Sequence, residues 1–346
     1  MNEKRTIFLD ILRVAATCAV VMLHVISGAL DLEGVEILPV QKNICLALFD
    51  VVTWCVPIFV LISGYLFLNP EREISFQKML SKYIRRIVLA LFIFGVPYAL
   101  LEMIATERTF HIIMIPKAFW MVCIGQSWAH MWYLYLIFCL YLLTPGLKWV
   151  LRRIPIPAVY FVEMILFVGS SIFPFLQKLS GVTIPVCLPD ECIYLFYYIC
   201  GYLFVRNTKV QQKNNSGIIW GESALIFLLM SGMVISRFSE NYSVQMAYEY
   251  PFAVLLAILL FDCLRNLDSK MEKLNTVCLE KLSALSFAVY LVHPIFTNIL
   301  YKGFHLLPFD FALWMSLPIF FAGVLLASVG LAILLRKVSF LQKYVL

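Results

Sequence analysis

Long apolar runs recur along this 346-residue chain, and they constrain its fold more than any other feature of the sequence. A helix needs about 20 predominantly apolar residues to cross the hydrocarbon core of a bilayer. With 62% hydrophobic and only 14% charged residues, the composition is too apolar for a soluble protein of this length. The sequence therefore predicts an all-α polytopic membrane protein.

The pattern predicts ten spans, and the loops between them test that number. The spans are expected at about residues 7–30, 44–68, 84–103, 131–149, 157–176, 192–206, 217–236, 249–264, 283–302 and 310–335. With the N-terminus inside, twenty Lys and Arg residues fall on the inner side and six on the outer side, and Arg13 lies within a span. This asymmetry is that of the positive-inside rule. We therefore expect both termini in the cytoplasm, and the net charge of +6 reflects topology rather than nucleic-acid binding.

One stretch is too broken to predict as an eleventh span. Residues 111–129 are semi-apolar but contain Pro116, Lys117 and Gly125, so we interpret them as a re-entrant or interfacial segment. No linker and no low-complexity tract divides the chain, which favours a single transmembrane domain over residues 1–346. The ten cysteines show no metal-binding spacing, and only Cys187 and Cys192 could pair, in a predicted outer loop.

The first predicted span carries a stripe of polar side chains. Asp10, Arg13, Thr17, His24 and Ser27 follow one another at steps of three, four, seven and three, which places them on one helix face. Arg13 and His24 lie about 16–17 Å apart along the axis. Asp10 could merely neutralise Arg13, Arg13 could snorkel to the headgroups, and His24 could be a core histidine. However, charge inside a membrane is expensive and must face protein or water, so the complete stripe indicates function.

Two motifs follow in the second and third spans. Pro57 predicts a kink in the second span, and Ser63-Gly64 predicts a close approach of another helix. At the start of the third span, a group of three cations is either an ordinary positive-inside cluster or a phosphate-binding patch strengthened by a helix N-terminus. These cations are Lys82, Arg85 and Arg86.

Two further motifs contain histidine. The fourth span opens with Trp128-Ala-His130-Met-Trp132-Tyr133, in which an aromatic belt explains Trp and Tyr but not His130. In the ninth span, Tyr290 and His293 are three residues apart and share a face. The following Pro294 frees a backbone carbonyl next to them.

Taken together, these motifs resemble acyltransferase family 3, a family of integral membrane proteins, over nearly the whole chain. The family pattern is Arg-x10-His, Val-Pro-x-Phe…Ser-Gly-Tyr, a basic third-span start, His-x-Trp-Phe/Tyr-Leu and Tyr-x-x-His-Pro. It is matched in order by Arg13 and His24, Val56–Tyr65, Lys82–Arg86, His130–Leu134 and Tyr290–Pro294. The resemblance implies ten spans and, most closely, a stand-alone O-acetyltransferase of bacterial surface glycans in the cytoplasmic membrane. Lys82 stands where many relatives have arginine, and a lysine does not supply a planar fork.

The resemblance also implies a reaction. The family is understood to move an acyl group, usually acetyl, from cytoplasmic acyl-CoA to a hydroxyl on the far side of the membrane. Acyl-CoA would then be a co-substrate, with no permanently bound cofactor and no metal. The acceptor would be an extracytoplasmic glycan or a lipid-linked saccharide.

The resemblance assigns roles to the residues found above. Arg85, Arg86 and Lys82 would bind the phosphates of the donor, together with Arg13, which Asp10 would orient. The pantetheine arm would follow the polar stripe toward His24. His24 would act either as general base on the acceptor hydroxyl or as an acyl-histidine relay, and the sequence leaves both open. The acceptor-site candidates are His130, Trp132, Tyr133, Tyr290 and His293.

A carrier is the main alternative. Intramembrane Asp, Arg and His are also typical of transporters, and the membrane domains of some membrane-bound serine racemases resemble this family. The sequence shows neither a racemase domain nor inverted repeats with broken helices, and these features would favour a carrier. A purely structural scaffold would not explain the charged stripe.

Overall fold

The computed structural model describes residues 6–208, 216–239, 246–271 and 276–346. Helices form all the regular secondary structure of these residues, and no strand occurs among them. The helices group into two compact units, one formed by residues up to 69 with 154–330 and the other by residues 70–153 with 331–346.

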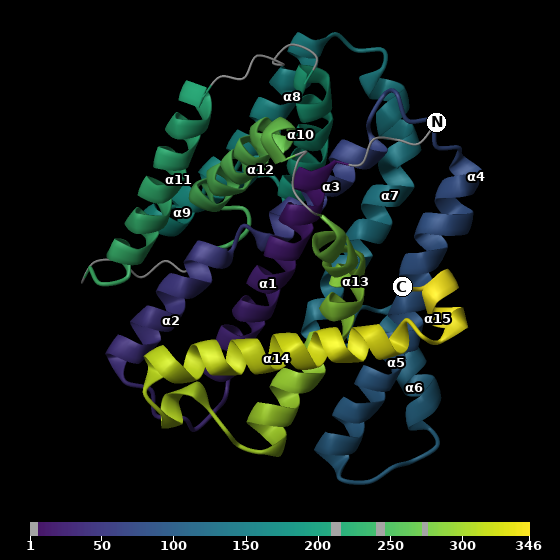
Figure 1. Ribbon diagram of the computed structural model, residues 1–346, viewed down its shortest axis with the longest axis vertical. Coiled ribbons are helices and arrows are strands. Elements are labelled where there is room, and N and C mark those ends of the chain that lie inside the picture. The colour runs from purple at the N-terminus through teal and green to yellow at the C-terminus, as the bar shows by residue number, and fades with distance from the viewer. Residues whose placement is uncertain (1–5, 209–215, 240–245, 272–275) are drawn as a thin grey trace. The chain divides into compact units, whose positions relative to one another are not determined.

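The first unit is built around its N-terminal helix. It contains α1 (Ile7–Leu30), α2 (Pro39–Val52), α3 (Cys55–Phe67), α8 (Ile156–Phe167), η3 (Val168–Ile172), α9 (Phe173–Ser180), α10 (Cys192–Thr208), α11 (Ser216–Ser236), α12 (Pro251–Met271), α13 (Val277–Asn298), η4 (Ile299–Gly303), η5 (Pro308–Asp310) and most of α14 (Leu313–Leu335). Helix α1 packs against α2, α3, α12 and α13 (Figure 1). The core of this unit therefore surrounds the helix that carries the predicted polar stripe.

Helices α3 and α10 approach so closely that side chains would not fit between them. A Cβ atom on Gly64 would lie 1.9 Å from the backbone oxygen of Tyr198, and one on Gly201 would lie 2.4 Å from the backbone nitrogen of Tyr65. The prediction that Gly64 permits close packing is thus confirmed. The predicted kink is also confirmed, because the helix is interrupted between Val52 and Cys55, just before Pro57.

The second unit is a smaller helical group. It contains α4 (Phe76–Lys78), η1 (Met79–Ile84), α5 (Arg85–Glu107), α6 (Met114–Cys123), η2 (Ala129–Met131), α7 (Trp132–Leu151), the last turn of α14 and α15 (Ser339–Tyr344). Helix α5 packs against α6, α7 and α15. With ten residues, α6 is about 15 Å long and too short to span a bilayer. The prediction that residues 111–129 do not form a span is therefore confirmed.

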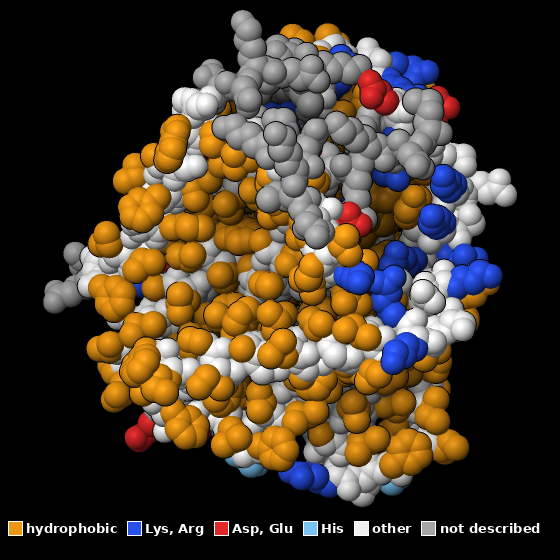
Figure 2. Space-filling model, in the orientation of Figure 1, with side chains coloured by type: hydrophobic (Ala, Val, Ile, Leu, Met, Phe, Trp, Pro, Cys, Tyr) orange, Lys and Arg blue, Asp and Glu red, His pale blue; other side chains and the backbone are white. Residues whose placement is uncertain are grey.

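The spans agree closely with the sequence pattern. Eight helical stretches of the described residues are long and apolar enough to cross a membrane: Ile7–Leu30, Pro39–Phe67, Phe76–Glu107, Ala129–Leu151, Ile156–Ser180, Ser216–Ser236, Val277–Gly303 and Leu313–Leu335. The two other predicted spans correspond to a shorter apolar helix, Cys192–Arg206, and to α12, which carries Asp262, Arg265 and Asp268. The face of the molecule in Figure 2 is largely hydrophobic, as expected for a chain surrounded by lipid.

Candidate functional site

The polar stripe of α1 lies beside a second polar stripe on α13. Along α13, Ser283, Ser286, Tyr290, His293 and Thr297 recur at steps of three and four, so they share a face. The two helices touch through these stripes at two levels, where Ser283 contacts Asp10 and His293 contacts His24. On both helices the residue numbers increase from the Asp10–Ser283 contact to the His24–His293 contact, so the two helices run parallel.

We call this line of contact the α1–α13 seam. On α1 its two levels are fourteen residues apart, which corresponds to about 21 Å along the helix axis.

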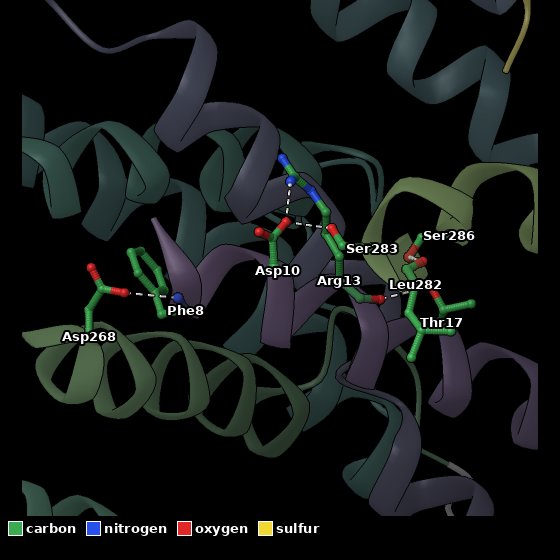
Figure 3. A network of polar contacts seen from close by, with 8 residues as sticks. All are labelled: Phe8, Asp10, Arg13, Thr17, Asp268, Leu282, Ser283 and Ser286. Atoms are coloured by element: carbon green, nitrogen blue, oxygen red, sulfur yellow. Dashed lines mark hydrogen bonds and ion pairs between the residues drawn. The ribbon is translucent and has the colours of Figure 1, made fainter. Parts of the chain in front are cut away.

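A charged pair forms the Asp10 end of the seam. The Asp10 carboxylate accepts a hydrogen bond from Ser283 Oγ at 2.5 Å and from Arg13 Nη1 at 3.3 Å, both on Oδ1 (Figure 3). The Asp10 side chain is 5% exposed, whereas that of Arg13 is 31% exposed. A buried carboxylate requires partners of this kind. Asp10 is thus anchored between two helices, and it holds a guanidinium that remains accessible.

The N-terminus of α1 and the hydroxyls next to the pair are also hydrogen-bonded. The backbone N–H of Phe8 donates to Asp268 Oδ1 of α12 at 2.9 Å, which satisfies one of the donors that every helix start leaves open. Thr17 Oγ1 donates to the backbone oxygen of Arg13 at 2.7 Å, and Ser286 Oγ to that of Leu282 at 3.5 Å (Figure 3). The Phe8–Asp268 contact joins α1 to α12, whereas the two hydroxyl contacts lie within α1 and within α13.

Two imidazoles form the other end of the seam. The ring centroids of His24 and His293 are 4.8 Å apart, and the ring planes meet at 68°. His24 Nδ1 lies 2.9 Å from the backbone oxygen of Val20, and His293 Nδ1 lies 2.8 Å from that of Tyr290. A carbonyl oxygen only accepts hydrogen bonds, so in each neutral ring Nδ1 carries the proton and Nε2 is the basic atom.

A proline fixes the anchor of His293. In a regular α-helix the carbonyl of Tyr290 would accept from the backbone N–H of residue 294, but Pro294 has none. The prediction that Pro294 frees a carbonyl beside Tyr290 and His293 is therefore confirmed, and the structure shows that His293 uses it. The Tyr290 ring lies 6.2 Å from the His293 ring, so this acceptor-site candidate belongs to the same end of the seam.

The predicted donor cations belong to the second unit. Lys82 lies in η1, and Arg85 and Arg86 open α5, but the helical stretch begins earlier, at Phe76, where Ser75 Oγ accepts from the backbone N–H of Lys78 at 3.2 Å. The expectation that a helix N-terminus adds its dipole at these cations is therefore wrong. Any phosphate binding here must come from the side chains themselves.

The C-terminal segment covers part of this cluster. Arg86 donates from Nε to the backbone oxygen of Val345 at 2.8 Å and from Nη2 to that of Leu346. The guanidinium of Arg85 lies 5.0 Å from the ring centroid of Tyr344, at cation–π distance. Figure 2 shows Lys and Arg side chains gathered over α4, α7 and α15. The sequence analysis missed the contact between Arg86 and the C-terminal segment, because nothing in the local pattern links residues 86 and 345.

The remaining acceptor-site candidates lie on α7 and its approach. His130 is buried, and its ring centroid is 5.7 Å from that of Tyr98, which stacks on Trp128 at 4.2 Å. Trp132 is exposed, and its ring is 6.2 Å from that of Tyr133. These residues form an aromatic group of the second unit. The seam thus brings together His24, Tyr290 and His293 among the predicted site residues.

The sequence analysis also missed a buried ion pair in the first unit. Arg237 donates from Nε to Asp50 Oδ2 at 2.5 Å and from Nη2 to Oδ1 at 2.8 Å, and the backbone N–H of Met246 donates to the same carboxylate at 3.1 Å. Arg237 is one of the six cations that the positive-inside pattern assigns to the outer side. An aspartate inside an apolar span was a signal of such a partner.

Two further acidic residues of the first unit, Glu163 and Asp262, are both hydrogen-bonded. Glu163 is buried in α8 and accepts from the Cys200 thiol of α10 at 3.0 Å, and Asp262 accepts from Arg265 three residues later. The first contact joins α8 to α10, and the second lies within α12. Cys187 and Cys192 are free thiols, and Cys187 lies 3.7 Å from Gln177 Oε1 instead.

Comparison with known proteins gives one family. A family model described as an acyltransferase domain matches residues 6–337, nearly the whole chain and both units. No curated protein and no solved structure gives a match. All five motifs identified in the sequence lie within the matched range. The chain therefore belongs to acyltransferase family 3 and is a multi-pass membrane acyltransferase.

Proposed function

We propose that this protein moves an acetyl group from cytoplasmic acetyl-CoA to a hydroxyl of an extracytoplasmic glycan or lipid-linked saccharide, in the bacterial cytoplasmic membrane. The observation that carries the proposal is the α1–α13 seam. It has a charged, partly exposed end at Asp10 and Arg13 and a basic, uncharged end at His24. An anionic donor and a proton transfer need these two environments.

The cations supply donor recognition in this proposal. CoA carries several phosphate charges, and guanidinium groups bind phosphate with paired hydrogen bonds. Arg85 and Arg86 bind these phosphates, with Lys82 adding charge. Arg13 contributes a further guanidinium, which is hydrogen-bonded to Asp10. Asp10 is held in turn by Ser283.

His24 supplies the chemistry. Its Nε2 takes the proton of the acceptor hydroxyl while the hydroxyl oxygen attacks the thioester carbonyl. The carbon–sulfur bond breaks, and the CoA thiolate leaves and takes up the proton that His24 Nε2 accepted, which returns His24 to its neutral form. Nδ1 keeps its proton throughout, because the backbone oxygen of Val20 holds it at 2.9 Å. General-base catalysis of this kind contributes about 10²–10⁴-fold to a rate.

The test uses proteoliposomes of known orientation that contain lipid-linked saccharides extracted from a bacterial envelope. Labelled acetyl-CoA is added at the face on which the loop cations lie, and label is measured in the saccharide fraction. For the parent we expect labelled saccharide and released CoA in the outer solution. For His24→Ala we expect neither labelled saccharide nor released CoA. His111→Ala is the matched control, since His111 is exposed and lies on the loop before α6. Flux of an unmodified small molecule without acetyl transfer would establish the carrier instead.

A further inference from the structure

We propose that His293 is a positioning residue for His24, which holds the His24 ring and stabilises the imidazolium that forms when His24 accepts a proton. This inference rests on the proposed function, in which His24 is the general base. It assigns to His293 a role different from the acceptor contact expected from the sequence. Three observations support it, and each concerns a different part of the pair.

The first observation is burial. His293 is 0% exposed, whereas His24 is only half-buried. His293 therefore has no surface to offer a substrate, whereas part of His24 is exposed. With the two ring centroids 4.8 Å apart, His293 is placed to act on the reaction through the His24 ring.

The second observation is the tautomer of His293. Its Nδ1 proton is held by the backbone oxygen of Tyr290, so the ring has a fixed orientation and a lone pair on Nε2. A neutral imidazole carries a dipole whose negative end is the Nε2 lone pair, and the attraction between such a dipole and a neighbouring cation grows where water is excluded. The edge-to-face contact, with the ring centroids 4.8 Å apart, thus places this polar ring beside the ring that becomes positively charged.

The third observation is Pro294. A buried imidazole N–H needs an acceptor, and a helix is weakened by an interior proline. Here the proline removes the one backbone donor that would compete with His293 for the carbonyl of Tyr290. The local sequence Tyr-x-x-His-Pro thus builds a fixed imidazole at the cost of a helix hydrogen bond.

The experiment compares two variants with the parent in the proteoliposome assay, with lipid-linked saccharide as the acceptor and CoA release as the readout. His293→Phe keeps a ring of similar size but removes Nδ1 and Nε2. Pro294→Ala keeps His293 but restores the competing backbone N–H. His111→Phe, at an exposed site, is the matched control.

We expect His293→Phe to lower kcat by about 10- to 100-fold, a part of what a general base contributes. The KM values for acetyl-CoA and acceptor should stay within about twofold of the parent, and Pro294→Ala should lower kcat by a smaller factor although it repairs the helix. A purely structural role predicts the opposite for Pro294→Ala, namely unchanged kcat and equal or higher stability.

Three results would overturn the inference. They are an unchanged kcat in His293→Phe, an unchanged kcat in Pro294→Ala, or a raised KM for the acceptor at constant kcat, which would make His293 an acceptor-binding residue. If His293→Phe does not insert into membranes, Pro294→Ala alone decides between the two roles. A parent protein that releases no CoA would instead contradict the proposed function.

Discussion

The C-terminal segment should compete with the donor for the arginines of the second unit. Arg86 binds the backbone oxygens of Val345 and Leu346, and Arg85 faces the Tyr344 ring. If these guanidinium groups bind the phosphates of acetyl-CoA, the segment must leave before the donor occupies the same N–H donors. Removing residues 339–346 should therefore lower the acetyl-CoA concentration at half-maximal rate.

The size of this effect follows from the contacts. A hydrogen bond to a charged group contributes about 1.5–3 kcal/mol, and an exposed cation–π contact contributes about 0.5–1 kcal/mol. Partial exposure of Arg86 and the cost of ordering eight residues reduce the sum. We expect a net docking free energy of about 1.4 kcal/mol for the segment. Its removal should then lower the acetyl-CoA concentration at half-maximal rate about tenfold.

Acetyl-CoA titrations of purified parent and variant proteins measure this shift. Tyr344→Ala and Val345→Lys undock the segment without shortening the chain, the second because Val345 is 1% exposed and a buried lysine beside Arg86 is unfavourable. Gln342→Ala, at an exposed position of the same helix, is the control. An unchanged or raised half-maximal concentration in all three undocked forms would show that donor phosphates do not bind these arginines.

The remaining predictions concern the seam and the packing around it. His24→Ala should abolish acetyl transfer while membrane abundance stays near that of the parent, and a folded variant with full transfer would remove His24 from the mechanism. Arg13→Lys should raise the acetyl-CoA concentration required, because a point charge does not replace a planar fork, and equal CoA binding by calorimetry would limit Arg13 to its pair with Asp10. Gly64→Ala should prevent accumulation of folded protein, because its Cβ would overlap the backbone of α10, and normal thermal stability in detergent would refute that packing.

Local pattern was sufficient for much of this fold. Each span depends on about twenty consecutive apolar residues, and the polar stripe of α1 depends on the 3.6-residue period of one helix. The anchor of His293 was also predictable, because the effect of Pro294 reaches only four residues back. In each case the determining residues lie within one helix.

The partners of buried polar groups were not predictable in this way. Ser283 is 273 residues from Asp10, and Arg237 is 187 residues from Asp50. Periodicity shows which face of a helix is polar, but not which helix covers it. The presence of Asp50 and Glu163 inside apolar runs did require partners, so the existence of these contacts could be predicted even where their identity could not.

The difference between the two ends of the seam follows from how each is satisfied. At the first end a full negative charge is held by a hydroxyl and a guanidinium, and the guanidinium keeps part of its surface exposed. At the second end, Nδ1 of each ring lies against a backbone carbonyl oxygen of its own helix. A neutral base placed there gains its charge during the reaction, and the His293 ring lies beside it with the ring centroids 4.8 Å apart. The response of the rate to His293 is for this reason the most direct measure of how the seam works.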